Sequence, residues 1–435
     1  MVRRTKFIVR ATVLLVSLIA LGAEALGGSG SLLIFADVEI GWDSTGAVTR
    51  DTIINLSNGF FEEVNVKMYL VNGDPPLDAV RDPSGVLIER AHRGWNHTGC
   101  QIDLSRYQAT YWSALTGLPG GCPFTALDSG RPPGRPDPEH PGGRLLRGFL
   151  YVWAVDNTSR EINWNYLRGD ATVFDFIDGA AWGYEAAAFR ALTGSRGQPL
   201  PDPGTLNLDG VEYEKAFSTL LMNFSAVGEV PLFGDHRLFH VDTDLTLLPV
   251  SQDFRQDGDG PVITKARFDI VNMNEDGRSG TVRCITCWDQ TLLSRYDGPN
   301  HFLFENLHTE IGSARIHGIA SSVVCGPDSR DEALLGVAVR IISFPSAGGL
   351  GDWTGDGIAD LNDHAAFAAC LAESGPEASS YDGCRPVFDS DEDGDIDLHD
   401  YRAIPFAVQI DRSYSAVNLV GEGTQTAVIR YDLPF

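Results

Sequence analysis

Basic residues are scarce in this chain. Its 435 residues include 33 Lys and Arg against 59 Asp and Glu, a formal net charge of −26. Proteins that bind nucleic acid neutralise phosphates with clustered cations, so this balance argues against nucleic acid as a partner. Long apolar runs are also missing, because no segment after residue 25 approaches the roughly 18 uninterrupted apolar residues of a spanning helix. We therefore expect no membrane span in the mature chain.

Familiar catalytic signatures are missing as well. The sequence has no Gly-x-Ser-x-Gly elbow, His-Glu-x-x-His helix, phosphate loop or dinucleotide fingerprint. A glycosidase needs only two carboxylates a few ångströms apart, which sequence spacing cannot test. Asp156, Glu161, Asp175 and Asp178 lie near aromatic residues, although such acids in strands are more often exposed positions beside core ones. With no motif for catalysis, the sequence leans against an enzyme.

The first 25 residues have the pattern of a secretory signal peptide. A basic start is followed by the apolar run 11–21, and Ala23-Glu24-Ala25 offers a small-x-small cleavage site. The run is too short to span a bilayer comfortably, which favours cleavage over an N-terminal membrane anchor. We therefore expect a protein that is secreted or held at the cell surface.

Seven cysteines, all after the signal, fit an oxidising compartment with about three disulfides and one cysteine left over. The Cys284-x-x-Cys287 pair lacks the second pair or nearby His cluster of a redox or metal motif, so we expect it to be structural. The expected disulfides are Cys100–Cys122, Cys370–Cys384, and Cys325 with either Cys284 or Cys287.

The chain is rich in turn-forming residues, with 47 Gly and 23 Pro, and poor in helical periodicity except around residues 185–192. Residues 63–72 alternate apolar and polar side chains, the period of a half-buried strand. Further β-rich stretches are 32–40, 51–56, 149–155, 171–177, 238–250, 261–273, 281–288, 334–344 and 426–433. Many strands without intervening helices predict a mainly β fold with an antiparallel β-sandwich body of one or two sandwiches.

Acidic residues concentrate near the C-terminus, where residues 350–400 contain fourteen Asp or Glu and a single Arg. An EF-hand loop binds calcium through positions 1, 3, 5, 7, 9 and 12, with Gly at position 6. Two stretches 37 residues apart match this pattern, with Gly357 and Gly394 at position 6. The first ligand set is Asp352, Thr354, Asp356, the carbonyl of Ile358, Asp360 and Asp363. The second is Asp389, Asp391, Asp393, the carbonyl of Asp395, Asp397 and Asp400. We expect each set to bind one Ca²⁺.

The surroundings of the two loops support the pairing. Position 8 is Ala359 in the first loop and Ile396 in the second, which suits the short β contact between paired loops. A helix is expected after the first loop, with one apolar face made of Ala366, Phe367, Cys370 and Leu371. The second exit helix is cut short by Pro405, which removes a helical hydrogen bond.

Position 12 is Asp in both loops, where ordinary EF-hands use Glu, and a helix is expected only after each loop. In these respects residues 351–408 resemble the duplicated dockerin repeat of secreted bacterial proteins, and a Cys370–Cys384 link resembles disulfide-stapled variants. The resemblance implies calcium binding. Positions 10 and 11 are Leu361-Asn362 and Leu398-His399, not the Ser-Thr pair that contacts cohesin in cellulosomal dockerins, which argues against cohesin docking. The body is faintly similar to uncharacterised secreted bacterial β-rich proteins through residues 50–58, 245–254 and 426–434.

The module is expected to be an insertion, because the predicted strand 426–433 follows it and would return to the body, beside residues 334–344. The expected division is a signal peptide (1–25), a β body (26–349), the calcium module (350–408) and a returning strand (409–435). The Pro/Gly-rich stretch 129–143 fits either a linker between two β domains or a surface loop within one.

Two other polar patterns are not expected to bind metal. Asn272-x-Asn274-x-Asp276-Gly277 begins like a calcium loop but would place Arg283 at position 12, so a β-hairpin turn is expected. His236 and His240 with Asp242 and Asp244 could be combined into a metal site, but in an extended strand residues i and i+4 are about 13 Å apart, too far to share one ion. These histidines, and His92 and His97, which lack an evident carboxylate partner, are expected at the surface or in turns.

The sequence therefore favours a secreted protein in which the two calcium loops stabilise or link an extracellular β scaffold. A cell-surface protein or a polysaccharide is the partner class that fits this setting. Two alternatives are an extracellular polysaccharide-degrading enzyme and a carbohydrate-binding protein that carries such a module. The latter would need exposed aromatic side chains on one face, for which Trp153, Trp164 and Trp182 are the candidates.

Overall fold

The computed structural model describes residues 28–201, 206–231, 239–250, 262–296, 300–320, 325, 332–343, 361–372, 387–388, 396 and 412–421. The paired strands within them are antiparallel and helices are few, which confirms the mainly β fold. None of the helices in these segments has the length and apolarity to cross a membrane. The signal 1–25, the strand predicted at 426–433 and most of both calcium loops lie outside the described residues.

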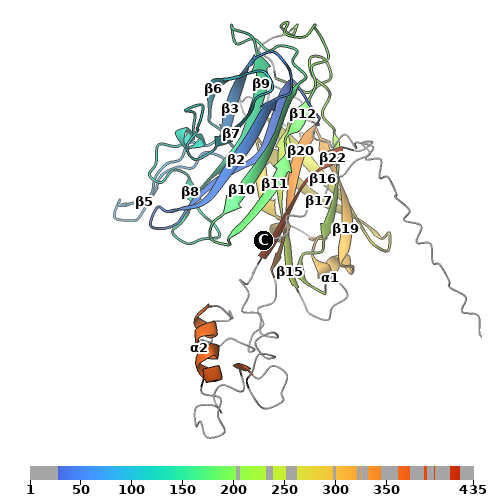
Figure 1. Cartoon of the computed structure of the whole chain (residues 1–435). Helices are drawn as coiled ribbons and strands as arrows, with labels where there is room; N and C mark the ends of the chain where they lie inside the picture. Colours follow the sequence, from blue (N-terminus) through green and yellow to red (C-terminus); the bar gives the residue numbers. More distant parts are fainter. Residues whose placement is uncertain are drawn as a thin grey trace, which may run out of the picture.

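Ten strands in the first half form one large sheet (Figure 1). Its order is β11-β10-β2-β1-β9-β3-β6, and β12, β7 and β8 pair with β1, β2 and β9. The strand at its centre, β1, is buried at every residue because both of its faces are covered. The bounds are β1 Leu32–Trp42, β2 Val48–Asn58, β3 Val64–Asn72, β6 His97–Leu104, β7 Ala109–Ser113, β8 Arg135–Pro136, β9 Arg144–Val155, β10 Leu167–Asp175, β11 Ala180–Glu185 and β12 Ala187–Phe189.

Long connections on the large sheet hold two further elements. A small hairpin pairs β4 (Val80–Arg81) with β5 (Leu87–Glu89), and η1 (Phe124–Leu127) is a short 3-10 helix. The Pro/Gly-rich residues 129–143 join η1 to β9, and their strand β8 pairs with β9 in the same sheet.

The second half of the chain forms a sandwich of two five-stranded sheets. The middle sheet has the order β14-β15-β20-β21, with β18 paired to β15, and the outer sheet has the order β17-β16-β19-β13-β22. The bounds are β13 Thr219–Ser225, β14 Gly228–Val230, β15 Phe239–Pro249, β16 Ile263–Asn272, β17 Gly277–Thr286, β18 Asp289–Leu292, η3 Leu293–Arg295, α1 Phe304–Leu307, β19 Ile311–Ile319, β20 Leu334–Ser343, β21 Arg412–Asn418 and β22 Val420–Gly421.

The middle sheet is covered on both faces, which makes the body a three-layer β structure. Along β20, Leu334 and Ala338 belong to the core shared with the outer sheet. The alternate residues Leu335, Val337 and Val339 belong to the core shared with the large sheet. Because side chains on a strand alternate between faces, one apolar strand serves two cores. Figure 1 shows the large sheet, in blue to green, beside the sandwich.

The cysteine predictions are confirmed where the residues are described. Cys100 is bonded to Cys122 and Cys284 to Cys325, while Cys287 is buried and unpaired. Cys370 is disulfide-bonded, and its expected partner Cys384 lies outside the described residues.

Two local predictions have opposite outcomes. The Asn272–Gly277 stretch is the turn between β16 and β17, as expected, with the Asn272 side chain accepting backbone hydrogen bonds from Asn274 and Asp276 at 2.9 Å. The helix suggested near residues 185–192 is wrong, since Ala187–Phe189 pairs with β1 as strand β12. Pairing to a buried strand overrides the weak local helical preference.

Candidate functional site

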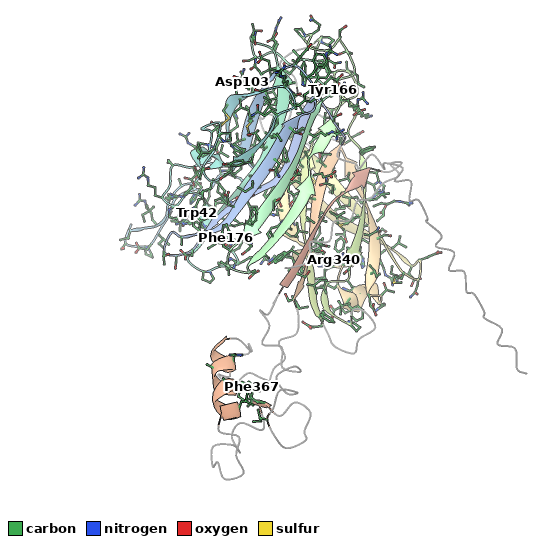
Figure 2. The ribbon with its side chains drawn as sticks, viewed as in Figure 1. Trp42, Asp103, Tyr166, Phe176, Arg340 and Phe367 are labelled. Carbon is green, nitrogen blue, oxygen red and sulfur yellow. A yellow bond between two sulfur atoms is a disulfide. The ribbon has the colours of Figure 1, made fainter. Side chains whose placement is uncertain are left out.

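A helix follows the first predicted calcium loop, as the sequence indicates. It is α2 (Leu361–Ala372), and its first residue is position 10 of the loop. Phe367 and Cys370 are buried, and Ala366 and Leu371 are partly buried against them. The four residues predicted to share its apolar face therefore do so. Figure 2 labels Phe367 on this helix.

The same small core contains residues from the second loop region. Phe388, which directly precedes the second loop, packs edge-to-face on Phe367 with ring centroids 5.4 Å apart. Ile396, at position 8 of that loop, is 2% exposed in the same cluster. The core therefore joins α2 to Phe388 and Ile396, which lie just before and within the second predicted loop. In paired EF-hand loops position 8 is where the loops approach each other, so this arrangement suits two loops acting together.

The predicted ligands themselves are outside the part of the chain whose side chains are described. This applies to Asp352, Thr354, Asp356, Ile358, Asp360, Asp363, Asp389, Asp391, Asp393, Asp395, Asp397 and Asp400. Among the described residues, no group of three or more His, Cys, Asp or Glu side chains is arranged to hold a metal ion. His240 accordingly pairs with Glu229 at 3.0 Å on the surface, as expected of a surface histidine.

The segment that contains the predicted calcium module lies in the chain between two neighbouring strands of the middle sheet. β20 ends at Ser343 and β21 begins at Arg412, and these two residues are paired across the sheet. Residues 344–411 therefore leave and re-enter the body at the same place. The strand found here, 412–418, is not the predicted returning strand 426–433, which lies outside the described residues.

The strand that follows the module is fastened to the large sheet. The Tyr414 ring stacks on Trp182 with centroids 4.8 Å apart, and its hydroxyl donates a hydrogen bond to Asp178. The Asn418 side-chain amide donates to the backbone carbonyl of Glu185 at 2.7 Å. These contacts of β21 therefore help to hold the large sheet against the sandwich.

Buried charged residues line the contact between the large and middle sheets. Arg50 on β2 lies between two carboxylates, 2.5 Å from Glu39 and 2.7 Å from Asp175. Gln290 on β18 donates to Glu39 at 2.5 Å, which extends this network into the sandwich. Asp37 lies two residues before Glu39 in β1, and one of its carboxylate oxygens has no partner among the described residues.

The pKa values of these carboxyl groups are shifted in different directions. Burial, reinforced by Glu39 and Asp244, raises the pKa of Asp37 well above its ordinary value. Burial would also raise the pKa of Glu39, but Arg50 and Gln290 outweigh it and lower that pKa. Burial, with Glu39 nearby, raises the pKa of Asp244 on β15 to about 8. Arg50 and Gln290 therefore favour the charged form of Glu39, while burial favours the neutral forms of Asp37 and Asp244.

The part of this network around Arg50, Glu39 and Asp244 offers little room for a substrate. Asp37 and Glu39 are 0% and 1% exposed. The cavity beside them, which Arg50, Arg147 and Asp244 help to line, has a volume of about 40 Å³. Ligand pockets usually measure roughly 300–1,000 Å³. We therefore assign the network to holding the two layers together, with Arg147 also donating to Asp74 and Gln290.

Of the four acids considered as glycosidase candidates, Asp175 and Asp178 lie in one turn, where the Asp178 backbone N–H donates to the Asp175 carboxylate at 3.0 Å. Asp156 accepts hydrogen bonds from Thr158 and Arg160 in its own turn. Asp175 pairs with Arg50, and Asp178 accepts from Tyr414. Glu161 is buried at the bridge between Val155 and Glu161. The partners of Asp175 and Asp178, Arg50 and Tyr414, are far from them in the chain.

The aromatic residues proposed for carbohydrate binding are wrong for that purpose. Trp153, Trp164 and Trp182 are 1%, 4% and 3% exposed. All three belong to the core of the large sheet. Trp153 and Trp182 are core-facing positions of β9 and β11, and Trp164 is buried in the connection between β9 and β10, so none of the three presents a sugar-binding face.

His92 also departs from the expectation of a surface position. It is 4% exposed, with Nε2 2.8 Å from Glu89 and Nδ1 3.0 Å from Asp128. Arg144 and Arg90 pair with the same two carboxylates. Glu89 is three residues from His92 and Asp128 is 36 residues away, so sequence spacing offered only one of the two carboxylates. His97, by contrast, is exposed and stacks on Tyr69.

Comparisons of the chain with protein-family models, curated proteins and solved structures found no match.

Proposed function

We propose that this is an exported calcium-binding protein whose dockerin-like loop pair stabilises and links an extracellular β scaffold. Each loop would bind one Ca²⁺ through the ligand sets given above. In this proposal the module is a calcium-dependent connection within the body, and docking to cohesin has no part in it.

The observation that carries the proposal is the small core around Phe367. It brings the helix after the first loop together with Phe388 and Ile396 from the second loop region. The two sequence matches alone do not indicate whether the loops contact each other. A shared apolar core supports the proposal that the two loops act as one unit.

Charge provides the physical reason for calcium. Residues 350–400 carry fourteen acidic side chains and one Arg, so the segment repels itself unless cations neutralise it. Oxygen ligands at flexible spacing suit Ca²⁺ better than the smaller, strictly octahedral Mg²⁺. Calcium bound only to the folded module stabilises it by mass action.

The test is thermal unfolding of the full chain with saturating calcium and with chelator, beside a variant lacking residues 350–408. We expect calcium to raise the melting temperature of the full chain and to leave the shortened chain unchanged. Magnesium at the same concentration serves as the ionic control. A full-length melting curve that is the same with calcium and with chelator would overturn the proposal.

A further inference from the structure

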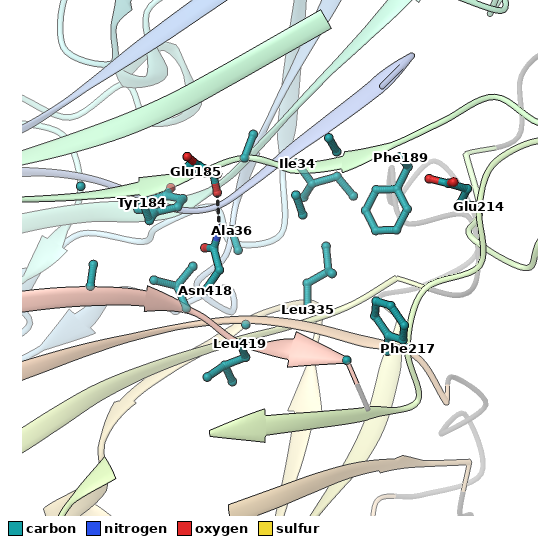
Figure 3. Close-up of a pocket in the computed structure, with 18 of the residues that line it drawn as sticks. Ile34, Ala36, Tyr184, Glu185, Phe189, Glu214, Phe217, Leu335, Asn418 and Leu419 are labelled. Atoms are coloured by element: carbon teal, nitrogen blue, oxygen red, sulfur yellow. Dashed lines mark hydrogen bonds between the residues drawn. The ribbon is translucent and has the colours of Figure 1, made fainter. Parts of the chain in front are cut away.

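A cavity of about 430 Å³ lies between the large sheet and the sandwich (Figure 3). One wall comes from Ile34 and Ala36 of β1 and from residues 183–189 of β11 and β12. The opposite wall comes from residues 335–337 of β20 and from β21 and β22. Its volume falls in the range of roughly 300–1,000 Å³ that is usual for ligand pockets, which often form between domains.

Elsewhere this contact contains well-packed aromatic side chains. Next to Ala36, the indole nitrogen of Trp288 donates to the Ala36 carbonyl at 2.7 Å. Farther along, Trp182 and Tyr414 stack on each other. Protein interiors are normally packed as densely as organic crystals. A cavity of this size between packed contacts has room for a ligand.

The chemistry of the walls and mouth defines that occupant. Ile34, Leu335 and Leu419 present aliphatic surface, and Figure 3 shows Phe189 and Phe217 facing each other at one end. The charged residues along the lining are Glu185, Glu214 and Lys215, which leave a net negative charge. A long apolar body fits the walls, and this charge disfavours an anionic head.

We propose that this cavity binds an amphipathic molecule with an aliphatic chain and a head group without negative charge. This site is separate from the calcium loops and does not depend on them for its chemistry. Phe217 is 37% exposed, so the cavity is reached from solvent at this end. The aliphatic chain would lie between β12 and β20.

The test uses three ten-carbon probes with the full chain in saturating calcium: decanol, decylammonium and decanoate. Calorimetry should show decanol and decylammonium binding with one molecule per chain. Decanoate should bind at least several-fold more weakly. Glu214→Gln should narrow that difference because it removes one carboxylate from the lining.

The decisive variant is Ala187→Leu. Ala187 is paired with Ile34 across β1 and β12, and paired residues on neighbouring strands face the same side, so the larger side chain enters the cavity. We expect decanol affinity to fall by at least about tenfold, which is 1.4 kcal/mol. Ala109→Leu, the same change at an exposed position on β7, should leave binding unchanged. Circular dichroism and the melting temperature establish that both variants are folded.

Three results would overturn the proposal. The first is no decanol binding to the full chain, and the second is equal decanol binding by the parent and a folded Ala187→Leu variant. The third is decanol binding that appears only after residues 422–435 are removed, since the cavity would then belong to that segment of the chain.

Discussion

Ser343 and Arg412 are opposite each other in the middle sheet, although 68 residues, 344–411, separate them in the chain. An unstructured loop of that length carries an entropy cost for bringing its ends together. A folded module fixes its own ends and reduces that cost. Calcium binding should therefore support the β20–β21 pairing, and through Tyr414 and Asn418 the contact with the large sheet.

The two calcium loops should differ in affinity. The second loop has five carboxylates at ligand positions and the first has four, because Thr354 occupies position 3 of the first loop. With similar geometry, more ligand charge gives tighter binding. Calorimetry should show a larger loss of total calcium affinity for Asp393→Ala than for Asp356→Ala. A greater loss from Asp356→Ala would contradict this ranking.

The core of the module can be tested without touching a calcium ligand. Phe367 is 2% exposed and packs on Phe388, so Phe367→Ala leaves a cavity that costs roughly 3–5 kcal/mol of local stability. Calcium titration should then show weaker binding at both loops. Phe61→Ala, at a side chain 51% exposed on the body, is the matched control and should bind calcium normally. Unchanged affinity in Phe367→Ala would mean that the core does not couple the loops.

The sequence predicted the parts of the fold that depend on local pattern. Residues 63–72 alternate apolar and polar side chains, and they form β3 within one residue of those limits. The helix face around Phe367 followed from helical spacing in the same way. Both rest on a periodicity that tertiary packing reinforced.

Sequence patterns could not predict which residues far apart in the chain contact each other. Asp37 and Glu39 are acids within an otherwise apolar stretch of β1, which is a sign of buried charge, but the sequence does not show that Arg50 and Gln290 meet them. The surface position expected for His92 was wrong for the same reason, because Asp128 contacts it only in the folded chain. The three tryptophans were considered only as aromatic residues, whereas the fold buries Trp153 and Trp182 on strands and Trp164 in a connection.

The Arg50 network should stabilise the folded state by far more than a surface ion pair does. Glu39 and Asp175 are almost fully buried beside Arg50, so Arg50→Met leaves two buried carboxylates without their cation. Removing one partner of a buried pair typically costs about 3–5 kcal/mol. Arg160→Met breaks a pair with Asp156 in which Arg160 is 54% exposed, and should cost at most about 1 kcal/mol. Urea unfolding of both variants measures the difference, and equal costs would show that the network does not stabilise the layers.

Asp244 should make the body less stable as pH rises from acid to neutral. Burial raises its pKa to about 8 in the folded state, against an ordinary value of 3.8. Below the ordinary value both states hold the proton and the carboxyl is not penalised. Between about pH 4 and 8 the unfolded state releases the proton while the folded state retains it, so the free energy of unfolding falls by up to about 1.4 kcal/mol per pH unit.

The neutral isostere isolates this effect. Asp244→Asn keeps the side-chain shape and has no proton to lose, so its unfolding free energy should decline less between pH 4 and 8 than that of the parent chain. The two proteins should have similar stability near pH 4, and the variant should be the more stable one at pH 8. Urea unfolding of both proteins is measured at each pH with saturating calcium. Because the loop carboxylates are the same in both proteins, their contribution cancels in the comparison. Parallel pH profiles for parent and variant would show that Asp244 titrates as an ordinary carboxyl and that the contact between the layers holds it charged.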